Sequence, residues 1–326
     1  MMTARENYLM TVAEHKKTGK IPLCGVDSAI CGGQFETFEN GPLGGGLDGF
    51  GVEWEVTATA GGQPSPVPHN YILDDITKWE DAVTFPDLDA YDWKGQAEAQ
   101  LANADRSNQV VDYHSYNAQF MRLTYLMGFE NGMCAMLIDP DACNALLTAI
   151  TDYKIKIVER VAEYFKPDFF TSFDDVAMER GLFISPNAYR TMIKPQHKRL
   201  NDAIKAYNMH PVMHCCGLCE SIVPDFIEEG AVAWTSAQPI NDIAAIQKTY
   251  GDKISVIGGY DTNGKAGTQF ATDDIIDAEV KRCVETYGPL GSYAFLGFRL
   301  MDSTDDPMAF FKGLEPINAA FEKYNK

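Results

Sequence analysis

The chain alternates short apolar runs with stretches in which apolar residues recur at helical spacing. After Asp139, for example, Leu146, Ile150 and Tyr153 belong to a stripe with three- or four-residue intervals, which is typical of an amphipathic helix. Apolar runs that alternate with such helices predict βαβ units around a parallel sheet. About seven or eight such units fit this length, so the expected fold is α/β, a (β/α)8 TIM-type barrel. The runs are Asp168–Phe173, Pro211–His214, Val232–Thr235, Ile254–Ile257 and Ser292–Leu296, with Ile21–Val26 and Gln109–Tyr113 as earlier candidates.

Three dipeptides mark the expected starts of helices. Asp139-Pro140, Ser185-Pro186 and Asp306-Pro307 each place a capping residue before a proline at the first helical position. We therefore expect a helix to begin at each of these three points.

Residues 1–108 differ from the rest and are expected to form an elaborated N-terminal segment of a single domain, 1–326. Between Glu39 and Val56, six glycines interrupt short β-prone pieces, which predicts long loops and short strands. The regular βα units follow over residues 109–326. The chain has neither a GxGxxG sequence that opens a helix nor a P-loop, so no phosphate-binding loop is predicted.

The charge balance restricts the classes of partner. The chain has 27 Lys and Arg against 46 Asp and Glu, a formal net charge of −19. This argues against nucleic acid and anionic membranes, because both attract basic surfaces. No apolar run is long enough to span a bilayer, and the N-terminus is too polar for a signal peptide. We expect a soluble, cytoplasmic protein whose eight cysteines are thiols.

The strongest candidate for chemistry follows the run Pro211–His214. Active sites of barrels form at the carboxyl ends of the strands. Side chains two apart on a strand face the same way, so His214 and Cys216 can converge on one ion. Imidazole and thiolate suit zinc, and a catalytic zinc has three protein ligands and an open position. Cys219, Asp175, Asp174 and Glu179 are candidates for the third ligand, and a core of buried thiols around a hydrogen-bonded histidine is the alternative.

Carboxylates follow two other runs. Asp174 and Asp175 follow the run Asp168–Phe173 and can serve as ligand, general acid or base, or substrate acceptor; the alternative is the N-cap of a following turn. Asp261 follows a double glycine and can reach the same site with its neighbour Tyr260, or else belong to a plain turn.

A further set of residues could bind substrate. Arg122 can hold an anion, or it can form an ion pair in helix packing. Phe50, Trp54 and Tyr71 can line a pocket for a planar ligand, or they can pack under long loops.

Seven motifs follow one another in the second half of the chain: Asp174-Asp175, Ile184-Ser185-Pro186, Lys194-Pro195, His214-Cys215-Cys216-Gly217, Glu228-Glu229-Gly230, Tyr250-Gly251-Asp252-Lys253-Ile254 and Gly258-Gly259-Tyr260-Asp261. Phe120-x-Arg122-Leu123, Gly128 and Asp139-Pro140 precede them, so that the set covers about 150 residues. In this order the motifs resemble the uroporphyrinogen decarboxylase superfamily. This resemblance implies a (β/α)8 barrel with its site at the C-terminal mouth.

The superfamily hosts two chemistries, and the chain resembles the corrinoid-dependent methyltransferases. The PxWxMRQAGRY motif, with which true uroporphyrinogen decarboxylases bind substrate carboxylates, is absent, and Arg5 is the only arginine before Arg106. His214 and Cys216 match the first two ligands of the methyltransferase zinc, whereas residues 290–302, where the third is expected, hold no cysteine, and Cys283 precedes them. Asp48–Trp54, Phe85–Asp89 and Asp92-Trp93 resemble members of veratrol or methoxyaromatic type.

The resemblance implies an O-demethylase component that moves a methyl group from a methoxyaromatic donor to the cobalt of a separate corrinoid protein. Cobalamin would arrive on that partner, zinc would be bound by the enzyme, and a homodimer is one oligomeric alternative. His214, with Cys216, and Asp175 would assist departure of the ether oxygen. Two alternatives stay open: a decarboxylase or lyase of a small aromatic or pyrrolic acid, with Asp261 or Asp175 as proton carrier, and a non-enzymatic binder of a corrinoid protein.

Overall fold

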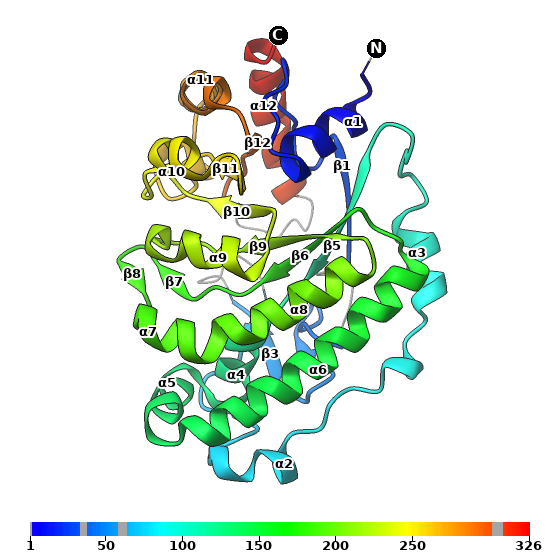
Figure 1. The fold of residues 1–326 in the computed structure, drawn as a ribbon, viewed down its shortest axis with the longest axis vertical. Helices are drawn as coiled ribbons and strands as arrows, with labels where there is room; N and C mark the ends of the chain where they lie inside the picture. Colours follow the sequence, from blue (N-terminus) through cyan, green and yellow to red (C-terminus); the bar gives the residue numbers. More distant parts are fainter. Residues whose placement is uncertain (1, 33–37, 58–63, 302–308) are drawn as a thin grey trace.

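A computed structural model describes residues 2–32, 38–57, 64–301 and 309–326. Its centre is a sheet of seven parallel strands that curls into a barrel (Figure 1). Leu23 forms a parallel bridge to Phe295, which brings the start of the chain to the last strand of the sheet. The strand order is β1 (Ser28–Gly32), β5 (Val110–Ser115), β6 (Phe169–Phe173), β9 (His210–His214), β10 (Ala233–Ala237), β11 (Ser255–Gly259) and β12 (Tyr293–Leu296).

Helices connect successive strands and cover the outside of the sheet (Figure 1). The longest covering helix, α6 (Pro140–Tyr164), packs side by side with α8 (Lys194–Ala206). The other helices of the layer are α4 (Gln119–Met127), α5 (Phe129–Ile138), α7 (Pro186–Ala188), η6 (Tyr189–Ile193), α9 (Val223–Glu229), α10 (Ile243–Tyr250), α11 (Asp273–Tyr287) and α12 (Ala309–Tyr324).

The predicted α/β barrel is confirmed, with one strand altered. The run Ile21–Val26 contributes only the bridge at Leu23, and β1 begins later, at Ser28. A turn separates the two, because the Asp27 amide donates to the Leu23 carbonyl over 2.8 Å and Gly25 has a φ of 82°. Such a positive φ costs glycine little.

Two of the predicted helix starts lie within the described residues. Pro140 begins α6 and Pro186 begins α7. The Ser185 side chain caps α7 by accepting a hydrogen bond from the Ala188 amide, whereas the Asp139 side chain makes no capping bond to α6. Asp306-Pro307 lies outside the described residues.

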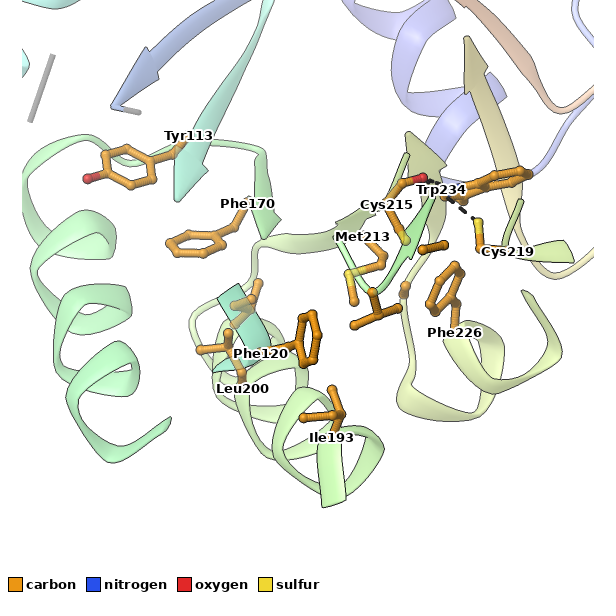
Figure 2. Packing of buried hydrophobic residues seen from close by; sticks show 14 of the residues in the cluster. Tyr113, Phe120, Phe170, Ile193, Leu200, Met213, Cys215, Cys219, Phe226 and Trp234 are labelled. Carbon is orange, nitrogen blue, oxygen red and sulfur yellow. Dashed lines mark hydrogen bonds between the residues drawn. The ribbon is translucent and has the colours of Figure 1, made fainter. Parts of the chain in front are cut away.

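The barrel interior is filled from its N-terminal end. Val110, Phe169 and Val212 belong to one buried cluster there, closed from below by Tyr8 and Val12 of α1 (Ala4–Tyr8) and η1 (Leu9–Ala13). Burying each such side chain contributes about 1.5–3 kcal/mol. A second, larger cluster fills the shell between strands and helices (Figure 2).

The strand pattern determines which side chains face the barrel mouth. Alternate side chains of a strand face opposite sides. Because Val110, Phe169 and Val212 face the interior, His114, Phe173 and His214 face it too, at the carboxyl ends of β5, β6 and β9.

The N-terminal segment has long loops and short elements, as expected. A small antiparallel sheet is formed by β2 (Gly46–Leu47), β3 (Glu53–Val56) and β4 (Pro64–Pro66), with α2 (Trp79–Ala82) and α3 (Trp93–Gln100) nearby in sequence. Two buried ion pairs hold this segment to the barrel helices. Arg122 Nη1 of α4 lies 2.7 Å from Asp48 Oδ2, and Lys154 Nζ of α6 lies 2.5 Å from Glu39 Oε1.

Among the described residues, no single helix is long and apolar enough to cross a membrane. Helices α5 and α6 meet the length and composition requirement only as a pair, and the pair is bent by 119°. All eight cysteines are free, as the sequence predicts.

Candidate metal centre at the barrel mouth

Three metal-ligating side chains meet at the carboxyl ends of β6 and β9. One ligand atom from each of Asp175, His214 and Cys216 lies within 4.8 Å of the other two. His214 Nε2 is 3.4 Å from Cys216 Sγ and 4.0 Å from Asp175 Oδ1. Across the part of the chain that the structure describes, this is the single group of three or more His, Cys, Asp or Glu side chains close enough to share an ion.

The strands place these groups in a defined way. His214 ends β9 and pairs in register with Phe173 of β6, and the two rings stack with centroids 4.0 Å apart. Cys215 faces the shell, where its carbonyl accepts a hydrogen bond from Trp234 Nε1 (Figure 2). Cys216 therefore returns to the side of His214, and its amide donates to Asp175 Oδ1 over 2.7 Å.

The backbone turns away from this centre at position 217, and that turn requires a glycine. Its φ is 84°, and a Cβ there would lie 2.7 Å from the backbone of Met178 in β7 (Ala177–Met178). The Leu218 amide also donates to the Met178 carbonyl. The short hairpin of β7 and β8 (Gly181–Leu182) thus packs directly against the Cys216–Gly217 turn.

Burial sets the protonation of the three groups. It lowers the pKa of His214 to about 3, with a smaller contribution from nearby His114, so the imidazole is neutral at pH 7. Burial, with repulsion from Asp174, raises the pKa of Asp175 to about 6 against the opposing effect of the Cys216 amide. Burial also raises the pKa of the Cys216 thiol, with repulsion from Asp175 adding to it. Cation binding would therefore have to displace the thiol proton.

The donor set fits zinc. Imidazole nitrogen, thiolate sulfur and carboxylate oxygen are the ligands that zinc takes in proteins, and three protein ligands leave a fourth position open for chemistry. All three side chains are partly exposed, with 15% of the His214 side chain and 33% of the Asp175 side chain accessible. The centre can therefore be reached from the barrel mouth.

The third member of the group is Asp175 and none of the other candidates. Cys219 Sγ lies 3.8 Å from the Cys215 carbonyl, buried beside Trp234 in the shell (Figure 2). Glu179 is exposed in the turn between β7 and β8. Cys283 of α11 is buried, with its thiol against the Gly259 carbonyl. These three side chains belong to packing or solvent, and the structure does not bring them to the centre.

Asp174 points away from its neighbour Asp175. It is fully buried, and its oxygens accept hydrogen bonds from the amides of Phe120 and Met121 over 3.0 and 2.8 Å. His197 Nε2 lies 2.7 Å from the same carboxylate. Asp174 thus caps the first turn of α4, which satisfies amides that a helix leaves free. The alternative predicted for Asp174 is the N-cap of a following turn, whereas the helix that it caps, α4, precedes it in sequence.

Asp261 and Tyr260 lie in a turn after β11. Asp261 Oδ1 accepts from the Gly264 amide over 2.9 Å, and its own amide donates to Glu279. Tyr260 is buried and donates to the Ala266 carbonyl. The structure brings neither to the metal-ligating group. The Gly258–Gly259 pair also has a packing reason, because a Cβ on Gly258 would lie 2.6 Å from the Ala237 carbonyl oxygen.

Three of the predicted substrate-binding residues, Arg122, Phe50 and Trp54, form one buried group around Asp48. Arg122 is buried under Phe50, with its guanidinium 4.0 Å from the ring centroid, and is paired with Asp48. Trp54 Nε1 donates to the same carboxylate over 3.1 Å. Tyr71, partly exposed, packs against Gly128, where a Cβ would lie 2.3 Å from its ring. The ion-pair alternative describes Arg122, and packing under the loops accounts for Phe50 and Trp54.

Two residues at the mouth were missed by the sequence reasoning. His114 Nε2 lies 3.4 Å from Asp112 Oδ2, both on the interior face of β5. The His114 ring is 5.0 Å from the Phe173 ring, which stacks on His214. The sequence did contain a signal for these two residues, because Asp112-x-His114 at a strand end has the same alternate spacing as His214-x-Cys216.

The chain matches the family model described as "Uroporphyrinogen decarboxylase (URO-D)" over residues 46–302. A structure described as a methyltransferase from Methanosarcina mazei superposes with a TM-score of 0.74 at 15% sequence identity, covering 100% of both chains. Xylanase B from Clostridium stercorarium F9 aligns with a TM-score of 0.40 at 14% identity, over 64% of this chain and 73% of that one. No curated protein matches the chain. The first superposition supports the fold, and the family match covers most of the sequence, so the chain belongs to the uroporphyrinogen decarboxylase (URO-D) family.

Proposed function

We propose that the protein is a methyltransferase that takes a methyl group from a methoxyaromatic donor and passes it to the cobalt of a corrinoid carried by a separate protein. The observation that carries the proposal is the group Asp175, His214 and Cys216 at the barrel mouth, which presents a zinc donor set. URO-D membership and the fold shared with a methyltransferase from Methanosarcina mazei support it. The corrinoid partner, a homodimer and a cytoplasmic location stay predictions.

The difficulty of the reaction lies in the leaving group. A neutral aryl ether gives up its methyl group poorly, because negative charge builds on the oxygen as the carbon–oxygen bond breaks. Zinc held by Asp175, His214 and Cys216 would supply a Lewis acid for that charge. Burial keeps His214 neutral, which is the form that ligates, and the Phe173 stack holds its ring. The Cys216 amide orients Asp175.

The surroundings of the centre suit an apolar planar donor. Phe173 at the mouth makes an edge contact with Tyr116, with ring centroids 4.3 Å apart. Arg122, the residue expected to bind an anion, is buried and paired with Asp48. The net charge of −19 also disfavours a polycarboxylate substrate such as a porphyrinogen.

A methyl-transfer assay tests the proposal. Purified protein is incubated with a panel of methoxybenzenes and with reduced cobalamin, free or on a corrinoid protein, and the loss of Co(I) absorbance is measured together with the phenol released. We expect equal amounts of demethylated phenol and methylated cobalamin. Protein that releases phenol without cobalamin, or that turns over no methyl donor, would contradict the proposal.

The decarboxylase alternative has one observation in its favour. The pKa of Asp175, raised by burial to about 6, gives a carboxyl group that can carry a proton near neutral pH. Asp261, the other proton carrier considered, is engaged in its turn with Gly264. Release of carbon dioxide from a small aromatic acid, with no corrinoid present, would favour this alternative.

A further inference from the structure

We infer that His114, oriented by Asp112, delivers the proton to the ether oxygen of the methyl donor as the methyl group departs. This inference rests on the proposed methyl transfer and assigns a task that a Lewis acid does not perform, the delivery of the proton that converts the departing phenolate into a phenol.

Asp112 and His114 lie side by side inside the barrel, and Asp112 is held in place by its own contacts. The Asp112 carboxylate is 4% exposed, and both its oxygens lie within hydrogen-bond distance of Thr171 Oγ1, at 2.8 and 3.1 Å. His114 follows two positions later on the same face of β5, with Nε2 3.4 Å from Asp112 Oδ2. A carboxylate fixed in this way sets the orientation of the imidazole.

The ring of Phe173 lies between the Asp112–His114 pair and the candidate metal centre. Strands β5, β6 and β9 are neighbours, and they carry His114, Phe173 and His214 on the interior face of their carboxyl ends. The ring centroids of His114 and Phe173 are 5.0 Å apart, and those of Phe173 and His214 are 4.0 Å apart. Phe173 thus lies between His214 and His114, and a planar donor bound at the mouth beside this ring would be flanked by the metal-ligating group and by His114.

His114 has the accessibility that a proton donor requires. Its side chain is 15% exposed, so a proton can be regained from solvent between turnovers. Because Nε2 is directed at Asp112, Nδ1 is the nitrogen left for substrate; within the described ranges it has no hydrogen-bond partner. A donor group must come within hydrogen-bond reach of the leaving atom, and His114 faces the barrel interior, where the methyl donor would bind.

The other acids near the mouth are already engaged. Asp175 belongs to the metal-ligating group and accepts the Cys216 amide. Asp174 is buried and bound to two α4 amides and to His197. Asp261 closes its own turn. His114 is therefore the group that can give a proton without dismantling a structural contact.

The step balances as follows. The carbon–oxygen bond of the ether breaks and its electron pair stays on oxygen. The methyl carbon forms a bond to the cobalt of the corrinoid co-substrate, whose Co(I) provides the electron pair for that bond. The oxygen takes the proton from protonated His114, which releases a phenol and leaves a neutral imidazole beside the Asp112 carboxylate.

The test varies the leaving group in the wild type and in His114→Gln. The kcat/KM for methyl transfer to reduced cobalamin is measured over methoxybenzenes that range from a nitrophenol to an unsubstituted phenol as leaving group. A proton donor matters most where the leaving phenolate is most basic. We expect His114→Gln to lose about 100-fold or more on anisole-like donors and under about 10-fold on the nitro-substituted donor.

Two further variants keep the result interpretable. Asp112→Asn should shift the leaving-group dependence in the same direction, and it serves as the test if His114→Gln does not fold. His210→Gln is the matched control, because His210 lies on the interior face of β9 at its opposite end, against Phe169, and should behave as the wild type. Zinc content and melting temperature are measured for each variant and should stay at the wild-type level.

The possible outcomes separate the two proposals. If the wild type transfers methyl groups and His114→Gln loses the same factor on every donor, or loses none, the assignment of His114 is overturned while the proposed function stands. If the wild type transfers no methyl group from any donor, the proposed function fails, and the assignment fails with it. The proton donor is established only if kcat/KM depends more steeply on the leaving group in His114→Gln and Asp112→Asn than in the wild type, while His210→Gln behaves as the wild type.

Discussion

Phe173 and His214 stack face to face at the barrel mouth, with ring centroids 4.0 Å apart and planes inclined by 21°. The contact joins two neighbouring strands, because Phe173 and His214 are partners in the register of β6 and β9. It restricts the imidazole that the account places in a metal centre. Replacing a residue that orients a metal ligand typically costs about 10–100-fold in metal affinity or activity.

Replacing Phe173 should weaken metal binding without unfolding the barrel. Phe173→Leu keeps most of the apolar volume and removes the stacked ring, so His214 gains rotational freedom. We expect zinc affinity to fall by about 10-fold. Competition with a chromogenic chelator measures the affinity, and unchanged affinity with the fold intact would show that the stack is irrelevant to the centre.

Replacing Asp174 should mainly reduce stability, whereas replacing its neighbour Asp175 should mainly reduce activity. Asp174→Asn removes a buried charge that caps α4 and contacts His197, so it should cost about 3–5 kcal/mol of unfolding free energy. Asp175→Asn removes a partly exposed metal-ligating group and should lower turnover while leaving stability close to that of the wild type. Urea unfolding and the methyl-transfer assay, run on both variants, compare the two effects. Equal losses of stability would refute the division of roles.

Because of the buried His197, we expect the folded protein to lose stability in alkaline solution. Burial alone lowers its pKa, but hydrogen bonds and charges of Asp174 and Glu229 outweigh burial and raise the pKa to about 9. The folded state therefore holds this proton more tightly than the unfolded chain, where histidine titrates near 6.5. The contribution is complete below about pH 6.5 and is lost as the pH rises through about 9.

The unfolding free energy of the wild type should thus decline between about pH 6.5 and 9 by on the order of a few kcal/mol. His197→Gln should be less stable at neutral pH and should lack most of this decline. Denaturant unfolding at a series of pH values measures both. Parallel pH profiles for the two proteins would exclude His197 as the source.

Much of the barrel could be predicted from sequence because apolar periodicity determines its elements. The runs that end in Phe173 and His214 became β6 and β9, and the stripe after Asp139 became α6. The pairing of His214 with Cys216 also follows from the alternation of side chains on a strand. Patterns among residues that are close in sequence were sufficient to predict these elements.

The third member of the candidate metal centre could not be chosen from such patterns. Asp174 and Asp175 are adjacent and chemically identical, and the choice between them depends on contacts far away in sequence. Asp174 is turned outward by the first amides of α4 and by His197, which leaves Asp175 at the mouth. The same reason explains Arg122, whose partner Asp48 lies in an irregular loop that no periodicity describes.

The central claim is that Asp175, His214 and Cys216 form a metal centre, and metal analysis of purified protein tests it most directly. The wild type, Cys216→Ser and the matched control Cys219→Ser are prepared in the same zinc-containing medium, and metal is measured per chain by mass spectrometry. The account predicts about one zinc per chain in the wild type and in Cys219→Ser, and little or none in Cys216→Ser. A metal-free wild type, or equal zinc in the wild type and Cys216→Ser, would contradict it.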